Sequence, residues 1–176
     1  MAIDDTKTFI PINIAILTIS DTRTEADDTS GDILAARVKD TGHNLVGRSI
    51  IRDDAALLAA HLESWIDDPA IDAIISTGGT GLTGRDVTPE AFARIKDARD
   101  IPGFGELFRW LSFQTIGTST VQSRACAIVA RGTYLFALPG SNGAVKDGWD
   151  GILAEQLDNR NRPCNFVELM PRLREI

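Results

Sequence analysis

The hydrophobic residues of the chain gather in short, nearly unbroken runs that are separated by polar segments containing glycine. Runs of this length, rich in β-branched residues, are typical of strands buried on both faces of a sheet. The pattern predicts five strands, at Ile12–Ser20, Leu45–Ile51, Ile71–Thr77, Ala125–Ala130 and Thr133–Leu138. Only Arg131-Gly132 separates the last two runs, which indicates a tight hairpin between them.

The segments between these runs carry the periodicity and the capping residues of helices. Helices are expected from Ser30 to Lys39 or Asp40, from Asp53 or Asp54 to about Ile66, from Thr88 onward, from Glu106 to about Phe113, and from Pro139–Asn142 to about Leu157. Their first residues, such as Ser30 and Thr88, are expected to cap them through side-chain oxygens. Residues 1–10 and 158–176 are expected to be irregular. No linker or internal repeat divides the chain, so one domain is expected over residues 1–176.

The alternation of strands and helices is the pattern of an α/β protein, a three-layer α/β/α sandwich with a mostly parallel sheet. The final hairpin requires one antiparallel strand, which we assign to Ala125–Ala130 at the edge of the sheet. Only a parallel last strand brings Pro139–Ser141 next to the loop that follows Thr77. Ligands bind such sheets at the carboxyl ends of the strands. The loops expected there are Ser20–Asp21, Asp53–Asp54, Thr77–Asp86 and Pro139–Asn142.

Composition and charge narrow the class of protein. The 176 residues are 43% hydrophobic and 24% charged, which is typical of a folded domain, and the net charge is −7. This acidity argues against nucleic acid as a partner, because neutralising phosphates requires Lys and Arg. No run approaches the ~18 apolar residues of a membrane span, and the acidic start is unlike a signal peptide. A cytoplasmic protein without membrane contact is expected.

The metal-binding and redox-active side chains are few. Cys126 and Cys164 form no CxxC pair, and Cys126 lies in a predicted strand, where a core position is expected. His43 and His61 are isolated and are expected to be solvated or capping residues, so no zinc site is predicted. Any catalysis is therefore expected to use carboxylates.

The glycine-rich segment Gly78-Gly79-Thr80-Gly81 follows a buried strand directly. Successive backbone N–H groups at such a turn form an anion-binding concavity. The spacing fits neither a P-loop nor a dinucleotide fingerprint, and a merely tight strand-to-helix turn is the alternative. Pro139–Ser141 is a second small-residue turn before a helix. Two such turns at one edge indicate a ligand that carries phosphate at more than one point.

Charged residues surround these turns. Arg85 and Lys146 are expected to reach a bound phosphate, but Asp86 is an unexpected neighbour for one unless it holds a metal ion. Asp53 follows the second strand at the same edge. The alternative for both aspartates is structural, as helix caps.

These segments resemble the molybdopterin-binding MoaB/MogA family of molybdenum cofactor biosynthesis over about Ile12–Phe166. The resemblance rests on paired motifs: Ser76–Ala91 with Leu138–Ser141, together with Ile19–Asp21 and Pro102–Glu106. Three further segments are similar to the bacterial MoaB branch: Arg109–Phe113, Gly117–Arg124 and Arg162–Phe166.

The resemblance implies an adenylyltransferase that uses ATP and Mg²⁺ to transfer AMP onto the terminal phosphate of molybdopterin, before molybdate insertion. It implies Asp53 and Asp86 as the catalytic, metal-holding residues. The substrate-binding residues expected in total are Ser20, Asp21, Thr77, Gly78, Gly79, Thr80, Gly81, Arg85, Ser119, Pro139, Gly140, Ser141 and Lys146.

One departure from the family leaves a second function open. The active transferases carry a lysine soon after Pro-Gly-Ser, whereas this chain has Asn142-Gly143, with Lys146 as the nearest cation. A non-catalytic molybdopterin-binding or carrier protein of the same pathway is therefore the alternative.

The resemblance also implies a homo-oligomer, a trimer or, in the MoaB branch, a hexamer, with transient contacts to other proteins of the pathway. Pro102-Gly103 is expected to interrupt the chain before the helix that starts at Glu106. Apolar side chains that would suit a subunit contact lie between this interruption and the end of that helix. They are Phe104, Leu107, Phe108, Trp110 and Leu111. The alternative is that they face the core of their own chain.

Overall fold

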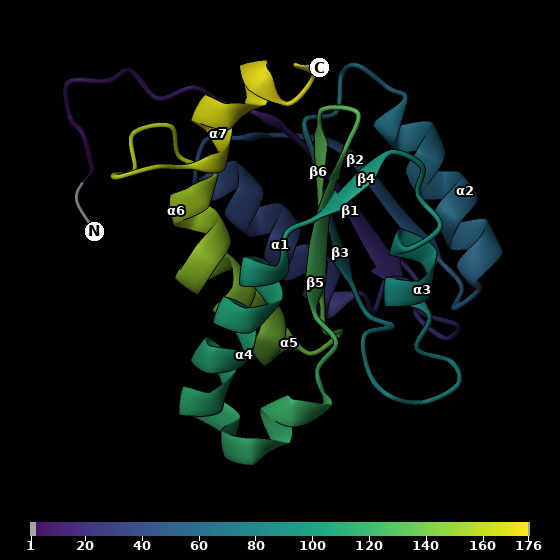
Figure 1. Cartoon of the computed structure of the whole chain (residues 1–176). Coiled ribbons are helices and arrows are strands. Elements are labelled where there is room, and N and C mark those ends of the chain that lie inside the picture. The colour runs from purple at the N-terminus through teal and green to yellow at the C-terminus, as the bar shows by residue number, and fades with distance from the viewer. Residues whose placement is uncertain (1–2, 176) are drawn as a thin grey trace.

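A six-stranded sheet forms the middle layer of the molecule (Figure 1), as described by a computed structural model for residues 3–175. Its order is β2-β1-β3-β6-β5-β4. The strands are β1 (Asn13–Ile19), β2 (Asn44–Ile51), β3 (Ala73–Thr77), β4 (Ala98–Asp100), β5 (Cys126–Ala130) and β6 (Thr133–Leu138). The pairs among β2, β1, β3 and β6 are parallel, so the loops after these strands share one edge.

Helices cover both faces of this sheet. Alternate residues of β1 divide between two cores: Ile14 and Ile16 face one core, Ala15 and Leu17 the other. The first core is closed by α1 (Thr29–Asp40), α4 (Pro102–Ile116), α5 (Asn142–Gly148), α6 (Ala154–Gln156) and α7 (Phe166–Leu169). The second is closed by α2 (Ala55–Ile66) and α3 (Thr88–Phe92). The predicted three-layer α/β/α sandwich with a mostly parallel sheet is confirmed. None of these helices is both long enough and apolar enough to span a lipid bilayer.

The antiparallel part of the sheet lies at one edge, as predicted. Its hairpin turn has positive φ angles at Arg131 (50°) and Gly132 (96°), and this twist suits a two-residue connection between β5 and β6. The strand β5 is not outermost, however, because β4 pairs antiparallel with its far side. All three residues of β4 are exposed, so no hydrophobic run announces it. It forms because β5 offers unpaired backbone groups.

Two helices begin earlier than predicted. The helix α1 is capped by Asp28, which accepts a hydrogen bond from Gly31 N at 3.1 Å, rather than by Ser30. The helix α4 begins at Pro102 and not at Glu106. Proline lacks the N–H that a first helical residue would leave unpaired, so Pro102 starts the helix instead of interrupting the chain.

Of the other two predicted helix caps, one is confirmed and one is wrong. Asp54 caps α2 by accepting hydrogen bonds from Ala56 N and Leu57 N, so Asp53 is not the cap. Thr88 does not cap α3. Its buried hydroxyl donates to the carbonyl of Gly78 at 2.9 Å, and it joins the helix to the glycine loop.

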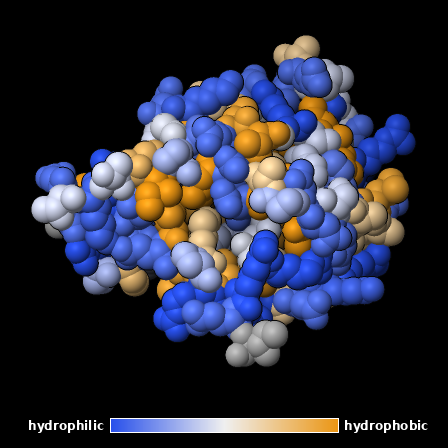
Figure 2. All heavy atoms as spheres, turned by 90° about the horizontal axis from the view of Figure 1, so that it is seen from above, coloured by the Kyte–Doolittle hydropathy of each residue, from blue (hydrophilic) through white to orange (hydrophobic). Residues whose placement is uncertain are grey.

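The last predicted helix is formed by α5, a turn of π-helix over Trp149–Leu153, and α6 in succession. The segment after it is less irregular than expected, because α7 packs on the sheet through Val167 in the first core. The hydroxyl of Tyr134 donates to the Phe166 carbonyl at 3.1 Å. Figure 2 looks onto this end of the molecule, where hydrophilic side chains surround hydrophobic ones that reach the surface.

His43 is buried rather than solvated. Its Nδ1 accepts a hydrogen bond from Ile12 N at 3.3 Å, and its ring packs between Phe9 and Trp149. Cys126 is half-buried and packs against the second core rather than inside it, and burial raises the pKa of its thiol to about 11.

Candidate functional site

The glycine loop lies where β1, β3 and β6 end. Gly78 and Gly79 have φ angles of 109° and 64°, and a Cβ on Gly78 would lie 2.2 Å from the carbonyl oxygen of Ile19. Any side chain at Gly78 would collide with the backbone of the neighbouring strand. The backbone of this loop can therefore approach a bound ligand closely, because no side chain lies between them.

The turn after β6 lies against this loop, as the predicted strand order requires. A Cβ on Gly140 would lie 3.3 Å from the Cα of Gly78, and Gly78 N donates to the carbonyl of Leu138 at 2.9 Å. The Thr77 hydroxyl donates to the Pro139 carbonyl at 3.2 Å. The two small-residue turns thus form one continuous surface.

The two candidate aspartates flank the glycine loop. A Cβ on Gly79 would lie 3.1 Å from Oδ1 of Asp53, and a Cβ on Gly81 would lie 2.8 Å from Oδ2 of Asp86. Burial raises the pKa of Asp53, and the negative charge of Asp86 raises it further. The sequence predicted that these residues would meet, and the structure brings them together.

Asp86 is held in its ionised form. Burial opposes ionisation, but hydrogen bonds from the Thr83 hydroxyl (2.6 Å) and from the amides of Thr83 (2.9 Å) and Gly81 outweigh it, so the pKa is lowered. Asp86 therefore keeps its charge while the neighbouring Asp53 is the more basic of the two.

The carboxylates fit a metal ion that is shared with a ligand. Within residues 3–175, no group of three or more His, Cys, Asp or Glu side chains could hold a metal by itself. Mg²⁺ characteristically takes one or two carboxylates and completes its shell with water and substrate phosphate oxygens. Asp53 and Asp86, beside a loop suited to anions, meet this requirement.

Arg124 organises the loop, and the sequence interpretation did not include it among the site residues. Its Nε donates to the Gly81 carbonyl at 2.6 Å, a terminal nitrogen donates to the Asp86 carbonyl at 2.5 Å, and it forms an ion pair with Glu90. Its own backbone N–H donates to the Thr80 carbonyl at 2.9 Å. Its place at the end of the Gly117–Arg124 family segment was the one available signal.

Arg23 has the same function for the other turn and was also missed. It donates to the Gly140 carbonyl at 2.9 Å and to the Ser30 hydroxyl at 2.5 Å. Ser20 fixes the start of its loop, because its hydroxyl oxygen accepts hydrogen bonds from the amides of Thr22 and Arg23. Ser20, a predicted substrate-binding residue, therefore contributes to the site by positioning the backbone of Arg23.

Asp21 and Arg85, both expected to bind substrate, form an ion pair with each other. The Arg85 side chain is 71% exposed. A ligand phosphate would have to compete with Asp21 for this guanidinium.

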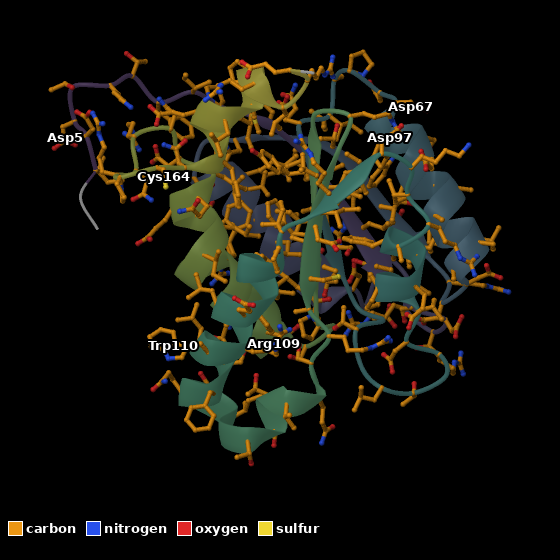
Figure 3. All side chains as sticks on the ribbon, viewed as in Figure 1. Asp5, Asp67, Asp97, Arg109, Trp110 and Cys164 are labelled. Carbon is orange, nitrogen blue, oxygen red and sulfur yellow. The ribbon has the colours of Figure 1, made fainter. Side chains whose placement is uncertain are left out.

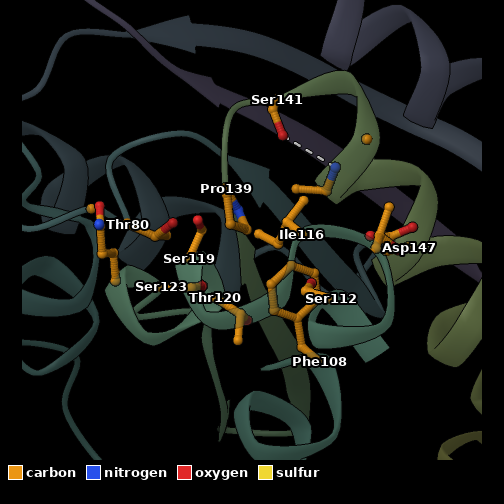
Figure 4. Close-up of a pocket in the computed structure, with 15 residues that line it drawn as sticks. Thr80, Phe108, Ser112, Ile116, Ser119, Thr120, Ser123, Pro139, Ser141 and Asp147 are labelled. Carbon is orange, nitrogen blue, oxygen red and sulfur yellow. Dashed lines mark hydrogen bonds between the residues drawn. The ribbon is translucent and has the colours of Figure 1, made fainter. Parts of the chain in front are cut away.

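A cavity of about 270 Å³ opens beside the glycine loop (Figure 4). Five predicted residues line it, namely Thr80, Gly81, Ser119, Pro139 and Ser141. The helix α4 contributes the ring of Phe108 and the side chain of Ile116, and α5 contributes Asp147. Ser141 is also the N-cap of α5 and accepts a hydrogen bond from Ala144 N at 3.2 Å. The walls are mainly apolar with a few convergent polar groups, as small-molecule sites usually are.

Lys146 lies outside this cavity. It is exposed and borders a neighbouring hollow together with Asp150 and Gln114. The structure therefore does not bring Lys146 to the Pro139–Ser141 turn.

The apolar residues of α4 face two ways. Phe104 and Phe108 are buried in the first core, while Leu107 and Trp110 are 42% and 61% exposed and Leu111 is half-buried. Figure 3 labels Trp110 on the outer side of this helix. Phe104 and Phe108 therefore face the core of their own chain, whereas Leu107 and Trp110 are exposed and available for a subunit contact.

Comparison with known proteins identifies the family. A family model described as "Probable molybdopterin binding domain" matches residues 15–159. Over 158 residues the chain is 49% identical to "Molybdenum cofactor biosynthesis protein B" of Escherichia coli (strain K12), covering 90% of this chain and 92% of that protein. The chain belongs to the MoaB/MogA family. Its place in molybdenum cofactor biosynthesis, inferred from the motifs around the glycine loop, is thereby confirmed.

Solved structures of the MoaB/MogA family share the fold. The crystal structure of a "Molybdenum cofactor biosynthesis protein B" has a TM-score of 0.85 at 33% identity and covers 97% of this chain and 100% of that one. The "tungsten cofactor synthesizing protein MoaB from Pyrococcus furiosus" has a TM-score of 0.76 at 32% identity, covering 94% of this chain and 98% of that one.

Proposed function

We propose that this protein binds molybdopterin in the cavity beside the glycine loop and transfers AMP from ATP to its terminal phosphate. The observation that carries the proposal is the convergence of Asp53 and Asp86 on an amide-lined loop that only glycine can form. A loop that merely turned the chain would have no need of two carboxylates, one of which is excluded from capping.

Each group then has a role. The glycine loop, through the amides of Gly79 and Thr80, and the hydroxyls of Ser119 and Ser141 hold the molybdopterin phosphate, while the amides of Gly78 and Gly81 bond to the Leu138 carbonyl and to Asp86. One of its oxygens attacks the α-phosphorus of ATP, a new P–O bond forms, and the bond to the β-phosphate breaks so that pyrophosphate leaves. Asp53 and Asp86 would hold Mg²⁺, which neutralises charge on the ATP phosphates.

A carrier function is the second candidate, and one observation favours it. The family's lysine after Pro-Gly-Ser is replaced by Asn142-Gly143, and the nearest lysine, Lys146, borders a different hollow. The lysine that would stabilise the charge on the transferred group is thus missing from the turn, where Arg23 is bonded to the Gly140 carbonyl.

The deciding experiment is incubation of the purified protein with molybdopterin, ATP and MgCl₂, followed by detection of adenylylated pterin and pyrophosphate. We expect both products in equal amounts. Tight molybdopterin binding without either product would establish the carrier, and absence of molybdopterin binding would refute both functions.

We further propose that the protein is a cytoplasmic homo-oligomer, a trimer or hexamer, with transient contacts to other proteins of the pathway. Support comes from the apolar side chains that α4 and the following 3₁₀ turn expose, which are Leu107, Trp110, Phe113, Ile116 and Val121. Large apolar side chains that are exposed together on one segment are typical of interaction sites.

A further inference from the structure

One carboxylate in the cavity has no role in the proposed transfer. Asp147 lies on α5, half-buried, and lines the cavity six residues after Ser141. Among the residues that the structure describes, its carboxylate has no hydrogen-bond or ion-pair partner. The neighbouring acid Asp150 is different, because it pairs with Arg37 at 2.6 Å and lies outside the cavity.

The cavity has chemically different ends. Thr80 and Ser119 lie toward the glycine loop, whereas Asp147 lies at the opposite end (Figure 4), where it also borders the neighbouring hollow. Between the two ends are the apolar surfaces of Phe108, Ile116 and Pro139. A phosphate is repelled from the Asp147 end and attracted by amides at the other. A bound ligand must therefore carry its phosphate at the glycine loop and its hydrogen-bond donors at Asp147.

A planar heterocycle with two adjacent hydrogen-bond donors suits the Asp147 end of the cavity. A carboxylate accepts two parallel hydrogen bonds from a donor pair, and such charge-assisted pairs are stronger than neutral ones. The 2-amino-4-oxopyrimidine ring of a pterin presents a ring N–H next to an exocyclic NH₂. We propose that Asp147 recognises this edge and thereby selects the pterin ring, an inference that rests on the proposed molybdopterin-binding function.

The surroundings of Asp147 fit this assignment. Burial and then the charge of Asp150 raise its pKa, so the free carboxylate is poorly compensated. A donor pair from the ligand supplies the compensation that the chain does not. A ring with oxygen in place of the 2-amino group would set an acceptor against the carboxylate, which costs affinity.

The test uses two stable, phosphate-free probes. These are 6-hydroxymethylpterin and 6-hydroxymethyllumazine, which differ only in the 2-amino group, and their binding is followed by fluorescence titration. We expect the wild-type protein to prefer the pterin by about tenfold or more, since a hydrogen bond to a charged group has this effect. Asp147→Asn keeps the size of the side chain but turns one acceptor into a donor. It should weaken pterin binding about tenfold and leave lumazine binding unchanged or stronger, because the amide NH₂ of Asn can donate to the 2-oxo group.

Two controls keep the result interpretable. Asp150→Asn makes the same charge change outside the cavity and should leave the preference unchanged, and Asp147→Ser repeats the test with a smaller side chain. Equal affinity of wild type for both probes, or equal weakening of both by Asp147→Asn, would overturn the proposal.

Molybdopterin itself separates this inference from the function on which it rests. If Asp147→Asn binds molybdopterin as tightly as wild type does, Asp147 does not read the ring, and the proposed function stands. If wild type fails to bind molybdopterin, the proposed function fails, and ring recognition fails with it.

Discussion

At the scale of single residues, Asp53 and Asp54 show how surroundings separate two identical side chains. Asp54 accepts hydrogen bonds from Leu57 N and Ala56 N, and these lower its pKa. Burial and Asp86 raise the pKa of Asp53 instead. The sequence could not say which aspartate caps α2, and that choice decides which one is left for chemistry.

The first prediction concerns charge at Asp53 and Asp86. Asp53→Asn and Asp86→Asn should each lower adenylyl transfer by a factor on the order of 10², because a preorganised charge is lost from the transition state. Molybdopterin affinity should stay nearly unchanged, since neither carboxylate attracts its phosphate. Transfer is measured as adenylylated pterin and affinity by calorimetry.

The matched control is the neighbouring cap. Asp54→Ala should cost about 1 kcal/mol of unfolding free energy, as lost N-caps do, and leave transfer unchanged. Full transfer in both Asn variants would reduce Asp53 and Asp86 to structural residues.

A second prediction follows from the effect of the Asp86 negative charge on the pKa of Asp53. Because the pKa of Asp53 is raised above its ordinary value of 3.8, the folded protein holds this proton more tightly than the unfolded chain does. The stability that the proton provides is therefore present below 3.8 and is lost as pH rises through the folded-state pKa. Asp86→Asn should lower the pKa of Asp53 in an NMR carboxyl titration. An unshifted pKa would show that burial alone acts.

The third prediction concerns Gly79. With its φ of 64°, any side chain costs about 1–2 kcal/mol of backbone strain, and a Cβ would also lie 2.3 Å from the Thr88 hydroxyl. Gly79→Ala should therefore displace the loop and lower molybdopterin affinity by about tenfold or more. Gly84→Ala, in the same loop but with no atom within 4 Å of its Cβ, should bind as wild type does.

At the scale of elements, one buried carboxylate joins several of them. Asp28 is fully buried and caps α1; it accepts a hydrogen bond from Thr18 of β1 at 2.8 Å and pairs with Arg48 of β2 at 2.9 Å. Arg23, 3.6 Å away, connects it to the turn at Gly140. Asp28 thus links the start of the fold to the site.

The fourth prediction is the loss of this junction. Asp28→Asn should cost about 2 kcal/mol of unfolding free energy, because the hydrogen bonds that the buried carboxylate accepts from Thr18 and Arg48 lose their charge, although Arg48 keeps its pair with Asp32. Burial opposes ionisation, but Arg48, Thr18 and Gly31 outweigh it and lower the pKa of Asp28. Its contribution is therefore present above 3.8 and is lost as pH falls through the folded-state pKa. Urea titrations of wild type and variant at neutral and acid pH should converge as the pH falls.

The helices, strands and loops also show which parts of the fold could be predicted from the sequence. The buried strands and the glycine loop were predictable, because continuous apolar runs and clustered glycines leave local signals. The strand β4 was not, because its exposed residues are ordered only by pairing with β5. Arg23 and Arg124 were missed for a related reason: their partners Gly140 and Gly81 are remote in sequence, so only the fold reveals them.

At the scale of the whole molecule, the exposed side of α4 is the feature that a single chain leaves unexplained. The fifth prediction is that the protein sediments well above its 19.1 kDa monomer mass at micromolar concentration. Trp110→Arg should shift it toward the monomer, because an uncompensated charge would enter the contact. Leu57→Arg, an equally drastic change at an exposed residue of α2, should not. A monomeric wild type would refute the interface.

The position of β6 determines when the sheet can be completed during synthesis of the chain. This strand is the last in sequence, yet it lies inside the sheet, where Thr77 of β3 meets Leu138. A growing chain can pair β1, β2 and β3 early, but the far side of β3 stays open until β6 leaves the ribosome. The candidate site, which needs the turns after both strands, is therefore completed late in synthesis. Premature termination before Leu138 would yield a chain with an exposed apolar strand edge and no site, a form that invites aggregation.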